Sequence, residues 1–102
     1  MKVKQFDLIY ALYALHEFDA PGRFPREAKE VLRPGGILLV MDWVRGAKTG
    51  ARERYFATKT VAGWMVDAGF DVLRREVHGQ TMALAGQLPI LREAVRPRRR
   101  AT

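Results

Sequence analysis

Residues 33–41 read RPGGILLVM, and this stretch decides the fold. Arg33 places a cation in the last turn of a helix, and the proline and two glycines after it break that helix. Residues 37–41 are all apolar, with no alternating polar side, which is typical of a strand covered on both faces of a parallel sheet. The stretch therefore predicts a helix that ends and a buried strand that begins in close succession.

The residues before this stretch predict another strand and the helix that connects the two. Residues 6–15 are nearly all apolar without a period of two, which again predicts a strand covered on both faces. Residues 19–22 are typical of a loop. Pro25 is tolerated only in a first helical turn, so we expect a helix that starts near residue 23 or 24. Its apolar residues recur at helical spacing: Phe24, Ala28, Val31 and Leu32.

The residues after it predict a second helix and a closing hairpin. The helix is expected to start near Arg52 and to end at Gly69, with one apolar stripe made of Ala57, Val61, Trp64, Met65 and Ala68. Residues 70–77 and 81–86 then predict two antiparallel strands around a tight turn. The order strand, helix, strand, helix, strand, strand predicts an α/β layered fold with right-handed crossovers and a mixed sheet.

The composition fits one small domain of a globular protein. The chain has 102 residues, of which 48% are hydrophobic, and it has no cysteine. Thiolate metal sites and disulfides are therefore excluded, which suits a reducing cytoplasm. No run approaches the ~20 apolar residues of a membrane span. The net charge is +7, and residues 92–102 hold five arginines and one glutamate, so we expect a domain over residues 1–91 followed by a basic, disordered tail.

Four segments in order carry a resemblance to a known family: FDLI at residues 6–9, ALHEF at 14–18, LRPGGILLV at 32–40 and WMVDAGF at 64–70. Together they resemble the C-terminal half of class I S-adenosylmethionine-dependent methyltransferases, especially those that act on small molecules and quinones. The resemblance implies a three-layer Rossmann-like half-domain with a four-stranded mixed sheet. It also implies methyl transfer to a small molecule as the activity. In family terms the strands would be numbered four to seven, in the spatial order 4-5-7-6.

The sequence departs from the family where the cofactor is held. The family's glycine-rich turn and its ribose-binding acidic residue do not occur here, and the two glycines at 35 and 36 read as a helix stop. Those parts give a nucleoside cofactor close backbone approach and hydroxyl acceptors. By the resemblance, Ala14 and Leu15 would lie near S-adenosylmethionine. We nevertheless expect the chain alone not to bind this cofactor as the family does.

Candidate site residues follow the first two predicted strands, because ligands of open α/β sheets bind beyond the carboxyl ends of strands. His16 and Glu17 follow the first strand, and either one could act as a base for an acceptor that loses a proton. The alternative is a pair that only caps the turn. Asp42 could bind a substrate hydroxyl or cap a turn, and Trp43 and Tyr55 could line a pocket or pack in the core. No metal site is predicted from two distant histidines.

The strand of residues 6–15 would form an exposed apolar edge of the sheet, and such an edge invites pairing. We expect a homodimer in which this strand pairs with its two-fold copy or the chain packs its bare apolar faces across the axis. The rival expectation is a separate polypeptide that carries the glycine-rich half and docks on the same edge. The arginine tail could contact nucleic acid weakly and without specificity, or remain a solvated terminus. Three functional readings follow: a methyltransferase that needs a complementary half, a non-catalytic self-associating binding or scaffold module, and a nucleic-acid binder.

Overall fold

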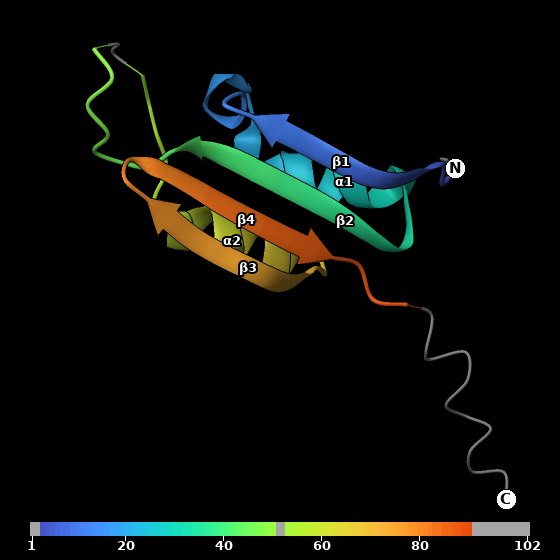
Figure 1. The fold of residues 1–102 in the computed structure, drawn as a ribbon. Coiled ribbons are helices and arrows are strands. Elements are labelled where there is room, and N and C mark those ends of the chain that lie inside the picture. Colours follow the sequence, from blue (N-terminus) through green and yellow to red (C-terminus); the bar gives the residue numbers. More distant parts are fainter. Residues whose placement is uncertain (1–2, 51–52, 91–102) are drawn as a thin grey trace, which may run out of the picture.

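The computed structural model describes residues 3–50 and 53–90, which form one sheet and two α-helices (Figure 1). The predicted basic tail lies outside these residues, so its prediction stays untested. None of the described helices is long and apolar enough to cross a membrane. In chain order the elements are β1 (Phe6–Leu12), the 3-10 turns η1 (Leu15–Glu17) and η2 (Pro21–Arg23), α1 (Phe24–Val31), β2 (Leu32–Trp43), α2 (Thr58–Asp67), β3 (Asp71–His78) and β4 (Thr81–Gln87).

The four strands form one mixed sheet in the order β1-β2-β4-β3 (Figure 1). β1 pairs with β2 in parallel, whereas β4 is antiparallel to both of its neighbours. β4 therefore inserts between the two strands that precede it in the chain. This confirms the mixed sheet and the predicted order 4-5-7-6.

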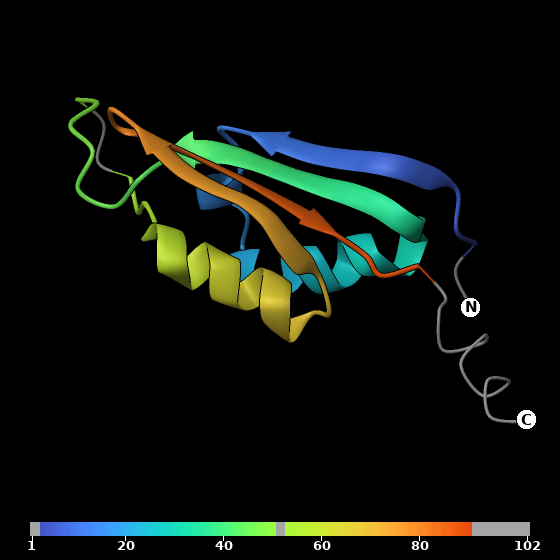
Figure 2. The same cartoon turned by 60° about the horizontal axis from the view of Figure 1, so that its bottom comes forward.

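Both helices lie on the same face of the sheet (Figure 2). The crossovers β1-α1-β2 and β2-α2-β3 advance across the sheet in the same direction, and right-handed crossovers that advance the same way place their helices on one side. The α/β class is confirmed. The described residues form two layers rather than the three that the sequence predicted, because nothing in them covers the second face.

The core lies between the sheet and this helical layer. Met65 of α2 is fully buried, and Trp64 packs against the core with its ring edge-on to Phe56 at 5.1 Å between centroids. Both were predicted as core residues. Burial of one such large side chain contributes about 1.5–3 kcal/mol. The strands add to this layer four side chains with no exposed surface: Leu38, Val40, Met82 and Leu84.

Three predicted boundaries were wrong. β1 ends at Leu12 rather than running to residue 14 or 15, because Tyr13 has a φ of 55° and turns the chain. The second helix begins at Thr58 rather than near Arg52, because Phe56 still forms an extended bridge with Val44. β2 already starts at Leu32, so the two glycines lie inside the strand and do not stop the helix.

The predicted burial of β1 was wrong as well. We expected a strand covered on both faces, yet most of its residues are exposed. Ile9 and Ala11 point to the helical layer, whereas Leu8, Tyr10 and Leu12 are 51%, 60% and 48% exposed. The apolar run without a period of two therefore predicted the strand correctly, but its prediction that both faces of the strand are covered was wrong.

Candidate functional site

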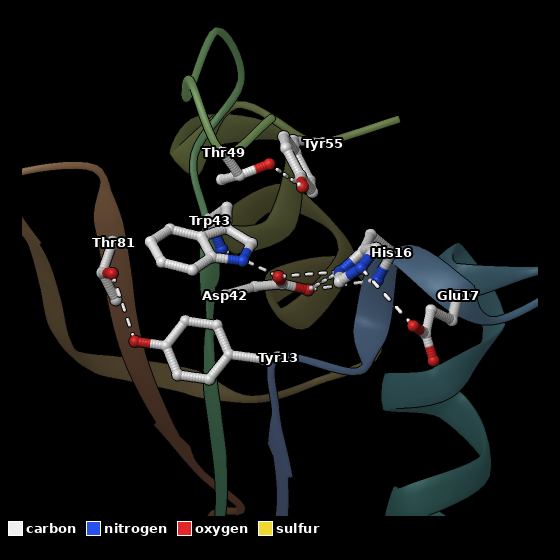
Figure 3. Close-up of polar contacts among 8 residues, drawn as sticks. All are labelled: Tyr13, His16, Glu17, Asp42, Trp43, Thr49, Tyr55 and Thr81. Atoms are coloured by element: carbon white, nitrogen blue, oxygen red, sulfur yellow. Dashed lines mark hydrogen bonds and ion pairs between the residues drawn. The ribbon is translucent and has the colours of Figure 1, made fainter. Parts of the chain in front are cut away.

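The candidate site is a hydrogen-bonded pair of side chains, His16 and Asp42, at the carboxyl ends of β1 and β2 (Figure 3). Nδ1 of His16 lies 2.8 Å from Oδ1 and 3.0 Å from Oδ2 of Asp42. The same carboxylate accepts hydrogen bonds from the backbone N–H of His16 at 3.1 Å and of Trp43 at 2.7 Å. The exposed side-chain fractions are 7% for His16 and 1% for Asp42, so both side chains are almost fully shielded from solvent.

This geometry assigns the proton on the imidazole of His16. An ionised carboxylate can only accept hydrogen bonds, so Nδ1 must be the protonated nitrogen that donates to Asp42. The lone pair of the neutral ring is then on Nε2. Backbone anchoring of both residues fixes the direction of that lone pair. The pair therefore presents one oriented proton acceptor, the arrangement that general-base chemistry requires.

Two further predicted residues border this imidazole. Oε2 of Glu17 lies 3.8 Å from Nε2 of His16, and the Glu17 side chain is 68% exposed. Tyr55 places its ring edge-on to the imidazole at 5.1 Å between centroids, and its hydroxyl is 2.7 Å from Oγ1 of Thr49. A proton that reaches Nε2 would be flanked by two carboxylates. The structure thus brings together His16, Glu17, Asp42 and Tyr55, which come from three separate segments.

The side chain of Trp43 lies on the opposite face of the sheet from that of Asp42. Its ring contacts that of Tyr13 at 5.0 Å between centroids, and the Tyr13 hydroxyl is 3.2 Å from Oγ1 of Thr81 (Figure 3). Asp42 and Trp43 are successive residues of a strand, so their side chains point to opposite faces. The rings of Trp43 and Tyr13 therefore form an aromatic pair on the bare face, away from the side that holds the imidazole of His16.

Sequence reasoning missed Tyr13 and Thr81. Tyr13 is the only described residue other than glycine with a positive φ, and its backbone N–H still donates to the carbonyl of Met41 at 2.7 Å. Left-handed backbone costs a bulky residue of order 1–3 kcal/mol and recurs at functional sites. No sequence signal marks such a conformation in a tyrosine. The contact to Thr81 spans 68 residues, so local patterns could not reveal it.

The described residues do not form a fitting site for S-adenosylmethionine. Leu15 is 1% exposed and lies in the core, so its side chain is not available to a ligand, and Ala14 is partly buried. Asp42 is the acidic residue at a strand end, but its oxygens already accept from His16 and Trp43. None of the described strands is followed by a glycine-rich turn into a helix. The residues present thus offer a proton acceptor but no cofactor cradle.

The described surface adds neither a metal centre nor a closed pocket at this pair. No group of three or more potential metal ligands occurs within residues 3–50 and 53–90. A surface hollow of about 420 Å³ is formed by residues that follow His16 in the sequence, among them Phe18, Asp19, Phe24 and Glu27. Neither His16 nor Asp42 lines this hollow, so it is separate from the His16–Asp42 pair.

Comparison with known proteins gives the same fold. A family described as methyltransferase domain matches residues 1–40. A solved structure of the [4+2]-cyclase SpnF has a TM-score of 0.71 and 22% identity, and the match covers 83% of this chain and 51% of that one. For an S-adenosylmethionine-dependent methyltransferase from Aquifex aeolicus the TM-score is 0.69, the identity 24% and the coverage 80% and 45%.

A third similar structure is a complex. It contains the Trm112 methyltransferase activator of Haloferax volcanii and a putative methyltransferase, with a TM-score of 0.68, 12% identity and coverage of 81% and 54%. The chain spans about half the length of these three solved structures. Identities below 25% carry the fold alone, and SpnF is named for a cyclisation. The resemblance found in the sequence is thereby confirmed: this chain has part of the fold of the S-adenosylmethionine-dependent methyltransferases, and its first 40 residues match their methyltransferase domain.

Proposed function

We propose that the chain forms the acceptor-side half of an S-adenosylmethionine-dependent methyltransferase that acts on a small molecule. The observation that carries this proposal is the oriented His16–Asp42 pair at the carboxyl ends of two parallel strands. Ligands of open α/β sheets bind at that edge. Because the described residues offer no cofactor cradle, a separate polypeptide with the glycine-rich half, or a second copy of the chain, completes the site.

In this proposal His16 acts on the acceptor. An acceptor hydroxyl, or a protonated amine, must lose a proton as its heteroatom gains a methyl group, and Nε2 of His16 receives that proton. Asp42 holds the ring and balances the charge that forms on it. Glu17, whose carboxylate lies 3.8 Å from the same nitrogen, adds to that balance. Tyr55, whose ring is edge-on to the imidazole of His16, is proposed to line the acceptor space, and Ala14 to border the cofactor. Trp43 points to the opposite face of the sheet and has no part in this proposal.

The need for a partner has support among the similar structures. One of them is a putative methyltransferase in complex with an activator. Within residues 3–50 and 53–90, the backbone of β1 pairs with β2 alone, so its outer edge can pair with another strand. That edge is where we propose that a second copy of β1, or the polypeptide with the glycine-rich half, docks. Which of the two binds decides whether the protein is a homodimer or a heterodimer.

The test uses one substitution that separates two roles of His16. In His16→Asn, an amide N–H can replace Nδ1 as the donor to Asp42, but no basic nitrogen remains. The tagged chain is purified from its native source with any bound partner, and transfer of labelled methyl groups to added small hydroxyl compounds and amines is measured. We expect the variant to retain the partner and cofactor binding, while methyl transfer falls about 10²–10⁴-fold.

A second candidate is a non-catalytic module that binds or scaffolds through self-association. The observation that favours it is the exposed apolar surface of β1 beside a histidine that is only 7% exposed. In that case His16 clamps η1 to β2 and carries no chemistry. No methyl transfer by any purified form of the chain would favour this candidate over the first. Unchanged transfer in His16→Asn would instead remove His16 from the role of base and leave the first candidate standing.

A further inference from the structure

The bare face of the sheet carries an apolar patch on β1 and β2. The pairing register places Leu8, Tyr10 and Leu12 beside Ile37, Leu39 and Met41. All six alternate along their strands with the residues that are buried against the helices, so their side chains lie on the bare face. The three β1 side chains are 51%, 60% and 48% exposed. Soluble monomers rarely expose contiguous apolar surface of this kind, and such patches mark interaction sites.

The same face carries a column of charges on β3. Arg74, Glu76 and His78 pair with Ala85, Ala83 and Thr81 of β4, which places them on the bare face as well. Nη1 of Arg74 is 2.8 Å from Oε2 of Glu76, and Nε2 of His78 is 2.9 Å from Oε1 of Glu76. Asp71 stands at the start of this column, opposite Gln87. Along the strand the column therefore reads negative, positive, negative, histidine.

We infer that two copies of the chain pack bare face to bare face. The two-fold axis lies between the sheets and runs across the strands, so each strand crosses over its own copy in the opposite direction. The β3 column of one copy then lies over the β3 column of the other copy, which runs in the opposite direction. Arg74 faces the partner's Glu76, and Asp71 faces the partner's His78. The guanidinium of Arg74 meets a carboxylate, and the carboxylate of Asp71 meets an imidazole that can donate a hydrogen bond to it, so the column is complementary to itself, as an isologous interface requires.

The apolar half of the face matches in the same arrangement. Tyr10 lies opposite the partner's Leu12, Leu39 opposite the partner's Met41, and Ile37 opposite the partner's Trp43. An axis parallel to the strands would instead allow β1 to lie over the charged column of β3. The arrangement across the strands is the one that joins apolar to apolar and acid to base over the whole face.

The dimensions suit a small but specific interface. Four strands ~4.8 Å apart and about seven residues long at ~3.3 Å per residue give a flat footprint of about 400 Å². Protruding side chains raise its accessible area toward the roughly 800 Å² that each partner of a standard interface buries. Packed sheets lie about 10 Å apart with their strands within about 30°. The inference does not depend on the proposed methyl transfer, and it uses the face of the sheet rather than the edge of β1.

The test is a charge exchange, followed by sedimentation equilibrium of the full chain. Arg74→Glu and Glu76→Arg each place like charges opposite one another at two symmetry-related positions, so we expect the dimer dissociation constant of each variant to rise at least about tenfold. The double variant Arg74→Glu/Glu76→Arg again places opposite charges at positions 74 and 76 of the two copies, and its constant should return to within about threefold of wild type. Circular dichroism checks that each variant is folded.

The matched control is Arg75→Glu, which makes the same charge change one residue away. Arg75 pairs with Leu84, so it points to the helical side, and its substitution should leave the constant unchanged. A wild-type chain that stays monomeric would overturn the inference, and this includes the case in which another polypeptide covers the face. A dimer that all three single variants leave intact would also overturn it, because pairing through the edge of β1 does not use these charges.

Discussion

Nδ1 of His16 and Oδ1 of Asp42 lie 2.8 Å apart, although 26 residues separate them in the chain. The contact joins η1, which follows β1, to the C-terminal end of β2. It also orients the imidazole of His16. One pair of atoms thus serves stability and any chemistry at this edge of the sheet. Substitutions that keep one role and remove the other can separate the two.

Asp42→Asn should destabilise the fold. The carboxylate accepts from three N–H donors, and an amide offers one oxygen and turns an NH₂ group toward the remaining donors. Leaving buried donors unsatisfied costs about 1–3 kcal/mol, and more next to a charged group. We expect the free energy of unfolding to fall by about 2–4 kcal/mol in urea denaturation.

Asp67→Asn is the control for this change. Asp67 is exposed at the end of α2, and surface substitutions of this kind shift stability by about 0.5 kcal/mol or less. Equal losses in the two variants would mean that the Asp42 carboxylate contributes no more than an exposed one.

His16 should show a split between two substitutions. In His16→Asn the amide N–H can still donate to Asp42, so we expect the free energy of unfolding to stay within about 1 kcal/mol of wild type. In His16→Ala the carboxylate loses its side-chain partner and the site gains a cavity, and the loss should be about 2–3 kcal/mol. Thermal unfolding of both variants measures the split. Identical melting temperatures of the two variants would show that the side-chain hydrogen bond to Asp42 does not contribute to stability.

The order of the elements could be predicted because it depends on local patterns. The apolar run of residues 37–41 and the Pro25 position fix a strand and a helix start without any long-range information. The layer count could have been predicted as well, because right-handed crossovers in the predicted order 4-5-7-6 advance the same way and place both helices on one side. The three layers came from the resemblance to the family fold. The start of α2 was wrong because Phe56 is held in a bridge with Val44, a contact that no periodicity reveals.

The site was predicted as two clusters and not as one contact. His16 and Asp42 were both placed at carboxyl ends of strands, since the topology rule requires only the strand order. That Asp42 accepts from His16 rather than from a ligand depends on the turn at Tyr13, whose φ of 55° no residue pattern signals. The place of Trp43 on the opposite face follows from strand alternation once the register is known.

Glu76 should titrate in a way that depends on His78. The hydrogen bond from His78, and next the charge of Arg74, lower the pKa of Glu76 below its ordinary 4.5. The ionised Glu76 therefore adds stability above that ordinary value, and this contribution is lost as the pH falls through the lowered pKa. In His78→Ala the pKa should rise toward 4.5, followed through the carboxyl resonance in an NMR titration.

His78 and Arg74 lower the pKa of Glu76 by different amounts, so removing each of them in turn gives a comparison. His78→Ala should raise the pKa of Glu76 more than Arg74→Ala does, because the hydrogen bond from His78 is the larger cause. A larger rise in the Arg74 variant would show that the charge of the guanidinium dominates instead.

Two glycine-to-alanine substitutions should change stability in opposite directions. A Cβ at Gly36 would lie 2.8 Å from the carbonyl oxygen of Arg33 in the same strand and 3.3 Å from that of Asp7 in β1, so the backbone of β2 would have to shift. We expect Gly36→Ala to lower the free energy of unfolding by about 1–3 kcal/mol. A Cβ at Gly63, inside α2, meets nothing within 4 Å, so Gly63→Ala should raise stability by about 0.5–1 kcal/mol through helix propensity. Urea denaturation of both variants measures the pair, and a Gly36→Ala chain as stable as wild type would contradict the close approach of β1 to β2 at this point.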